Sequence, residues 1–82
     1  MERIAVKSSS LVAIGYDPST LTFEAEFPGK DEQPGPLWQY APVDVAVYAS
    51  MLLPGASVGR IFHREIKSNP DVVATRVDEV TA

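Results

Sequence analysis

The absence of cysteine from a chain of only 82 residues restricts how its fold can be stabilised. A core of this size supplies only about 3–5 kcal/mol, and small proteins commonly add disulfides, a structural metal or self-association. Without cysteine, disulfides and thiolate metal sites are excluded. We therefore expect one small domain with a thin margin of stability, for which self-association is the remaining supplement.

The composition is that of an ordinary globular protein, with 45% hydrophobic and 22% charged residues and a formal net charge of −4. No apolar run approaches the roughly 18 residues that a membrane helix needs, and residues 1–7 contain no signal-peptide core. We therefore expect a cytoplasmic protein that does not bind membranes. The acidic balance argues against a general nucleic-acid binder, because non-specific affinity comes mainly from neutralised phosphates.

Strand patterns dominate the first half of the chain. Residues 11–14 are apolar and lead into turn-forming residues at 15–20, which predicts the first strand of a hairpin. In 21–27 apolar and polar residues alternate, which predicts a strand with one buried face and one acidic, solvated face. A charged loop with Pro and Gly follows at 29–36, and 37–40 then returns as a third strand with large rings.

Helical spacing replaces the strand pattern after Pro42. Apolar residues between 43 and 52 predict a core-facing helix, and Asp44 suits its N-terminus. A second helix is expected from 58 to 67, with Ser57 as its N-cap.

The predicted fold class is therefore α+β, a three-stranded antiparallel β-meander followed by two short helices packed on one face. Residues 1–68 form the predicted domain. Residues 69–82 are expected to be a largely flexible tail, because untethered chain ends usually fray, and an edge strand is the alternative.

Trp38 and Tyr40 are the first candidate ligand-binding residues. They lie two positions apart in the third predicted strand, so both rings face the same side of the sheet. Such rings can stack successive bases of a single strand. The commoner role of paired rings is to pack against a helix laid on the sheet, and that alternative stays open.

The second predicted helix separates core contact from charge. Arg60, Arg64 and Lys67 share one side at spacings of four and three residues, away from the apolar positions. This basic stripe can meet phosphates, or it can be an ordinary solvated helix face. His63, the one histidine of the chain, lies in the same segment and is a further candidate ligand-binding residue.

Catalytic and metal-binding chemistry has little support in the sequence. Serines 8–10 lack a Gly-x-Ser-x-Gly context and are best explained as strand-entry residues whose hydroxyls bond the backbone. A zinc site needs about three or four clustered ligands, which one histidine without cysteine does not supply. We therefore expect no enzyme activity, no metal and no cofactor.

Several motifs, in order along the chain, resemble the KTSC domain. They are Arg3, Val6-Lys7-Ser8-Ser9, Ile14-Gly15-Tyr16-Asp17, the triplet Trp38-Gln39-Tyr40 and the segment from Ser57 to Ile66. This family is named for its occurrence at the C-terminus of some lysyl-tRNA synthetases and also occurs as stand-alone bacterial or phage proteins. The triplet stands where the family has Tyr-x-Tyr. The resemblance implies a small domain, and RNA binding is the activity suggested for the family.

Two functions from different classes follow. The first is a small non-enzymatic module that binds RNA through the basic stripe and the strand aromatics. The second is a protein-interaction accessory that docks on another protein or on a copy of itself, which the acidic charge, the thin core and the loop at 29–36 favour.

Overall fold

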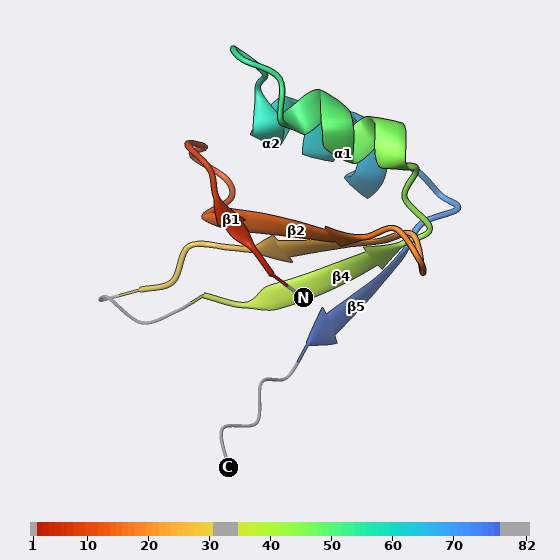
Figure 1. The fold of residues 1–82 in the computed structure, drawn as a ribbon. Coiled ribbons are helices and arrows are strands. Elements are labelled where there is room, and N and C mark those ends of the chain that lie inside the picture. Colours follow the sequence, from red (N-terminus) through yellow and green to blue (C-terminus); the bar gives the residue numbers. More distant parts are fainter. Residues whose placement is uncertain (1, 31–34, 78–82) are drawn as a thin grey trace.

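The computed structural model describes residues 2–30 and 35–77. At its centre is a five-stranded antiparallel sheet in which the strands pair in sequence order. The strands are β1 (Ile4–Ala5), β2 (Ala13–Asp17), β3 (Thr22–Glu26), β4 (Leu37–Ala41) and β5 (Val73–Val77). Between β4 and β5 the chain forms α1 (Val45–Met51), α2 (Val58–Ile61) and the π-helical continuation η1 (Phe62–Lys67) (Figure 1).

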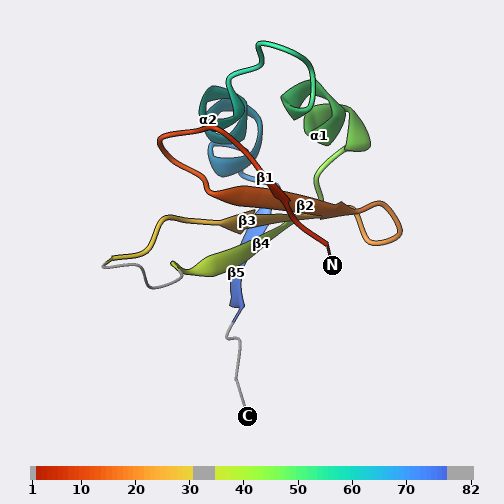
Figure 2. The same ribbon diagram turned by 60° about the vertical axis from the view of Figure 1, so that its left-hand side comes forward.

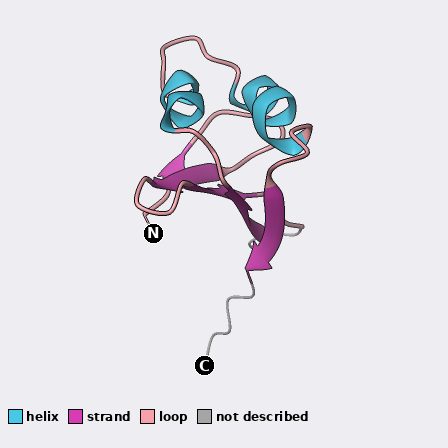
Figure 3. Ribbon diagram, turned by 90° about the vertical axis from the view of Figure 1, so that its right-hand side faces the viewer, coloured by secondary structure: helices cyan, strands magenta, loops and turns pink. Residues whose placement is uncertain are grey.

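The helices lie on one side of the sheet, as two further views show (Figures 2 and 3). We call that side the covered face and the opposite side the open face. The α+β class, the antiparallel sheet and the two short helical segments are thus confirmed. Within the described ranges, no helix is long and apolar enough to cross a membrane.

The expectation of three strands is wrong, because β1 and β5 extend the sheet at its two edges. β1 has two residues, which is too short to produce a periodic pattern. β5 is exposed at four of its five positions, so it lacks the alternation that burial of one face imposes. Residues 73–77, expected in a flexible tail, therefore form a strand paired with β4, and residues 78–82 lie outside the described part.

The period-two pattern of β3 determines which of its side chains enter the core. Phe23 and Ala25 are fully buried on the covered face, as the alternation predicts. Glu24, expected on a solvated face, is only 3% exposed although it lies on the open face. The remaining core residues come from every layer of the fold: Leu11, Ile14, Tyr40, Val43, Met51, Val58, Ile61, Phe62 and Ile66.

The two helical segments begin where the sequence predicts. Asp44 caps α1, and its carboxylate accepts a hydrogen bond of 2.8 Å from the amide of Ala46. Ser57 stands at the N-cap of α2, but its hydroxyl makes no capping hydrogen bond. The π-helical turn of η1 changes the spacing in the second segment, because a π-helix bonds i to i+5.

Candidate functional site

Trp38 and Tyr40 both point from β4 to the covered face, as their spacing predicts. Trp38 pairs with Ala25 and Tyr40 pairs with Phe23 in the neighbouring β3. Tyr40 is only 7% exposed, whereas Trp38 is half-buried. The protein therefore does not present two open rings on which successive bases could stack.

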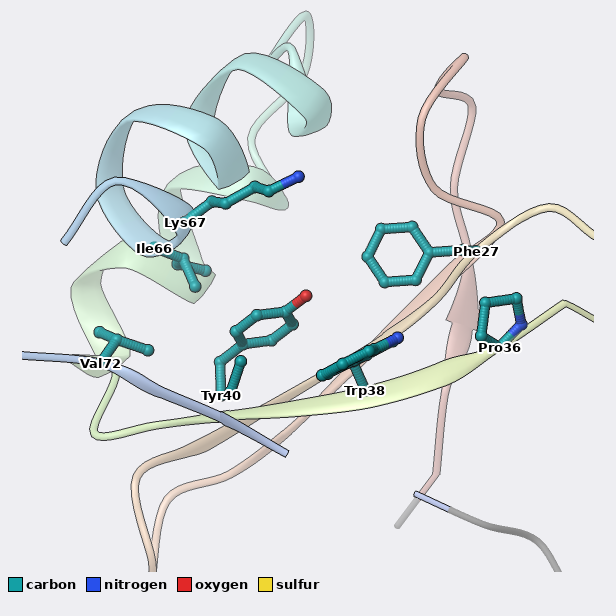
Figure 4. Close-up of a pocket in the computed structure, with 8 residues that line it drawn as sticks. Phe27, Pro36, Trp38, Tyr40, Ile66, Lys67 and Val72 are labelled. Carbon is teal, nitrogen blue, oxygen red and sulfur yellow. The ribbon is translucent and has the colours of Figure 1, made fainter. Parts of the chain in front are cut away.

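The ring of Tyr40 belongs to the core, and its hydroxyl reaches the edge of the core. The ring packs edge-to-face on Phe62 with a centroid separation of 5.2 Å. Burial raises the pKa of the phenol above its ordinary value. No described residue bonds the hydroxyl, yet no fully buried side-chain oxygen or nitrogen of the described residues lacks a partner, so the hydroxyl reaches solvent. Figure 4 shows it pointing into the space between Trp38 and Lys67.

That space is a groove of about 530 Å³, which lies between β4 and the end of η1 (Figure 4). The volume is within the range of roughly 300–1,000 Å³ that small-molecule sites occupy. Ala74 of β5 pairs with Tyr40, and its small side chain leaves room beside the ring. The lining residues of this β4–η1 groove are Phe27, Pro36, Trp38, Tyr40, Ile66, Lys67, Val72 and Ala74.

Three polar groups interrupt the apolar lining of the β4–η1 groove. They are the indole nitrogen of Trp38, the hydroxyl of Tyr40 and the ammonium of Lys67 (Figure 4). The indole and the ammonium only donate hydrogen bonds, while the phenol donates or accepts. No described residue bonds any of the three. The groove therefore suits a flat ligand that carries hydrogen-bond acceptors and negative charge.

A family model described as the KTSC domain matches residues 7–69, which include β2, β3, β4 and all three helical elements. The chain belongs to the KTSC domain family. The matched range also includes the aromatic and cationic lining of the β4–η1 groove, namely Phe27, Trp38, Tyr40 and Lys67.

Two relatives agree with this membership in the KTSC family. An uncharacterized protein from Stutzerimonas stutzeri (strain A1501) is 39% identical over 67 residues, which are 82% of this chain and 86% of the relative. The crystal structure of a KTSC domain protein from Yersinia pestis has a TM-score of 0.74 and 28% identity, over 94% of this chain and 97% of that one. The chain thus spans nearly the whole length of both proteins.

The triplet Trp38-Gln39-Tyr40, which resembles the Tyr-x-Tyr of the KTSC family, serves both faces of the sheet. Its first and third residues line the β4–η1 groove on the covered face. Its middle residue points to the open face, where the amide of Gln39 donates to Glu24 over 3.0 Å. The triplet therefore connects the groove to a structural hydrogen bond on the opposite side.

Only one residue of the predicted basic stripe borders the β4–η1 groove of this KTSC domain. Lys67 lines the β4–η1 groove, whereas Arg60 and Arg64 do not, although all three are exposed. Arg64 pairs with the carboxylate of its neighbour Glu65 over 3.1 Å. An exposed pair of this kind adds little stability, but it offsets the positive charge of Arg64 locally.

His63 is exposed and does not line the groove. Its imidazole contacts the ring of Phe62 edge-on, with a centroid separation of 5.5 Å. Within the described ranges, no group of three or more His, Asp or Glu side chains is arranged to hold a metal ion. Of the six predicted site residues, the groove thus brings together Trp38, Tyr40 and Lys67.

Sequence reasoning missed the apolar half of the groove. Phe27 was recognisable, because it continues the buried alternation of Phe23 and Ala25. Val72 and Ala74 were not, because they belong to the segment expected to be a flexible tail.

The open face carries a different polar cluster. The guanidinium of Arg3 donates to the Glu24 carboxylate over 2.9 Å and lies 3.4 Å from the Glu26 carboxylate. Gln39 bonds the other oxygen of Glu24. The nearly buried carboxylate thus has partners on both oxygens, as buried charges require. This Arg3–Glu24–Gln39 cluster ties the residue before β1 to β3 and β4.

Proposed function

We propose that this KTSC domain is a small non-enzymatic module that binds single-stranded RNA and receives one unpaired base in the β4–η1 groove. The observation that carries the proposal is the set of three unbonded polar groups, from Trp38, Tyr40 and Lys67, around an apolar space. An exposed stretch of single strand can turn a base out to enter such a space. The ligand class also agrees with the RNA binding suggested by the family resemblance.

The chemistry of the groove supports a nucleotide over a purely apolar ligand. A base is flat, so its face can lie against Trp38, and its edge carries oxygen and nitrogen acceptors. The adjoining phosphate supplies negative charge for Lys67. Since the indole and the ammonium only donate, a base edge rich in acceptors fits best. Uracil and guanine present such edges, whereas adenine and cytosine place an amino donor there.

The formal net charge of −4 is unevenly distributed along the chain. All seven Lys and Arg residues lie in the described ranges, together with seven of the eleven Asp and Glu residues. The remaining four acids are in 31–34 and 78–82. Arg3 is committed to Glu24 and Glu26 on the open face, so phosphate contacts must come from the helix side.

One stacked base and one or two phosphate contacts imply modest affinity. Stacking of a base on an aromatic ring contributes about 1–3 kcal/mol. Each phosphate contact to a single strand adds a slope of about −0.7 to the plot of log affinity against log salt concentration. We therefore expect weak binding of short oligonucleotides, with a shallow salt dependence.

The test uses Trp38, the one tryptophan of the chain, as the reporter, because its indole lines the groove. Titration with an oligouridine of about ten nucleotides should change its fluorescence. Oligoadenosine of equal length should bind more weakly. Lys67→Glu should lower the affinity for oligouridine about tenfold or more and reduce the salt slope by about 0.7.

Lys7→Glu is the matched control, because it makes the same charge change at an exposed position next to β1, at the opposite edge of the sheet from β5. It should change the affinity far less than Lys67→Glu. Equal weakening by both variants would mean that only total charge matters, and would contradict a role for the groove. Unchanged fluorescence up to millimolar oligonucleotide would remove RNA as the ligand.

A further inference from the structure

β5 places a second cation beside the β4–η1 groove. Arg76 pairs directly with Trp38 across the two strands, just as Ala74 pairs with Tyr40. Residues directly opposite in an antiparallel pair have their Cβ atoms about 4.5–5.5 Å apart on the same face of the sheet. Arg76 therefore stands next to Trp38 on the covered face, and its side chain is exposed. It does not line the groove itself, so it lies just outside it.

Arg76 and Lys67 approach the groove from different walls. Lys67 belongs to η1, on the helical side, whereas Arg76 belongs to β5, the edge strand of the sheet (Figure 1). The space in front of Trp38 and Tyr40 lies between these two walls (Figure 4). Among the described residues, no Asp or Glu lines the groove, so no carboxylate of the lining offsets the positive charge of either wall.

We propose that Lys67 and Arg76 bind the two phosphates that flank the inserted base, so that the ligand is a nucleotide inside an RNA strand and not the end of one. This inference rests on the proposed function of the groove. A nucleotide inside a strand has a phosphate on each side of its sugar, whereas a nucleoside at the end of a strand has only one. Cations on both walls match the first arrangement.

The guanidinium of Arg76 suits this role. It has five N–H donors in a planar fork that fits phosphate oxygens, so its interaction within the protein leaves donors for a ligand. Its plane can also lie against the ring of Trp38 or against a base. The commoner role of a cation in an edge strand is to prevent another strand from pairing with that edge. That role makes no contribution to ligand binding, so binding measurements separate the two.

The salt dependence of binding counts the phosphate contacts. Each contact to a single strand contributes a slope of about −0.7, so the wild type should show a slope of about −1.4 with oligouridine. Arg76→Gln should halve this slope and weaken binding about fivefold at low salt, as expected for one exposed ion pair. Fluorescence polarisation of a dye-labelled oligouridine is the readout, because the emission of Trp38 would itself respond to a change in its neighbour.

Two short ligands test the position of the second phosphate. The middle base of the trinucleotide UpUpU has a phosphate on each side, whereas each base of the dinucleotide UpU has only one. In competition with the labelled oligouridine, the wild type should bind UpUpU about fivefold more tightly than UpU. Arg76→Gln should bind both with about equal affinity, because only Lys67 remains to bind a phosphate. The same preference for UpUpU in both proteins would overturn the proposal.

Lys7→Gln is the matched control, because it removes one positive charge at an exposed position next to β1, at the opposite edge of the sheet. It should keep both the salt slope and the preference for UpUpU. If Arg76→Gln also keeps both while Lys67→Glu weakens binding, the groove binds RNA without Arg76 and only this inference is wrong. If the wild type binds no oligouridine, the proposed function and this inference are both wrong.

Discussion

The two faces of the sheet differ in whether their polar side chains are hydrogen-bonded within the protein. On the open face, the carboxylate of Glu24 is bonded by Arg3 and Gln39 and is only 3% exposed. On the covered face, the hydroxyl of Tyr40 projects from a ring that is also buried, and no described residue bonds it. Both residues are thus almost fully buried and end in a group that can form hydrogen bonds.

The difference separates a structural polar group from one available to a ligand. A buried polar atom is normally satisfied within the protein, because its desolvation is costly. Glu24 follows this rule through side chains from distant parts of the chain. Tyr40 keeps its hydroxyl at the β4–η1 groove, where water or a ligand can bond it. Substitutions in the open-face cluster should therefore lower stability, whereas substitution of the Tyr40 hydroxyl should lower ligand affinity.

The largest expected effect is on the open face. Arg3→Ala removes the guanidinium from the carboxylate of Glu24, which keeps its bond from the Gln39 amide in a position that is 3% exposed. Loss of the partner of a buried charge costs about 2–3 kcal/mol when part of the site can rehydrate. The free energy of unfolding, measured by urea denaturation, should fall by that amount.

Oligouridine binding by the folded Arg3→Ala protein should be unchanged, because Arg3 does not line the β4–η1 groove. Arg3→Lys serves as the control, since it keeps the charge but not the planar donor fork, and should recover part of the lost stability. A loss below about 0.5 kcal/mol in Arg3→Ala would show that water replaces the guanidinium at little cost.

A smaller effect of the reverse kind is expected at Tyr40, where ligand affinity should change and stability should not. Tyr40→Phe removes a hydroxyl that no described residue bonds, so the free energy of unfolding should change by less than about 0.5 kcal/mol. Oligouridine affinity, read from Trp38 fluorescence, should fall about fivefold, which corresponds to one lost hydrogen bond of about 1 kcal/mol.

Tyr16→Phe is the matched control for this prediction. The hydroxyl of Tyr16 donates to the backbone carbonyl of Val43, so its removal should cost about 1 kcal/mol of stability and leave oligouridine affinity unchanged. If Tyr40→Phe instead loses stability and keeps its affinity, the Tyr40 hydroxyl has a structural role and the contrast between the two faces disappears.

The elements with strong periodicity were predictable from sequence. The alternation of β3 and the apolar spacing around α1 follow directly from burial on one side, and both appear where they were expected. β1 and β5 were not predictable in this way. Neither has a buried side, and backbone pairing to a neighbouring strand leaves no pattern in the side chains.

The candidate site was only partly predictable for a similar reason. Spacing places Trp38 and Tyr40 on one face of the sheet, but it does not determine how deeply each ring is buried. The basic stripe assumed a regular α-helix, whereas Arg64 and Lys67 lie in the π-helical η1, where the number of residues per turn differs. The groove also includes Ala74 of β5, whose pairing with β4 depends on tertiary structure.

The smallest expected effect is a loss of stability at alkaline pH. Burial raises the pKa of Tyr40 and Tyr48 above 10.0, and burial followed by the charges of Asp44 and Asp17 does the same for Tyr16. The folded state therefore holds the phenolic protons more tightly than the unfolded state. Their contribution is complete below pH 10.0 and is lost as the pH rises through the folded pKa values.

Tyr40→Phe turns this pH dependence into a test of the groove. The variant should lose one of three contributions to the alkaline decline in the free energy of unfolding, measured by urea denaturation between about pH 9 and 11. In the wild type, ionisation of Tyr40 also places a negative charge beside the ligand, so oligouridine affinity should fall over the same range. That fall should be weaker in Tyr40→Phe. An identical fall in both proteins would mean that the Tyr40 hydroxyl does not face the bound base.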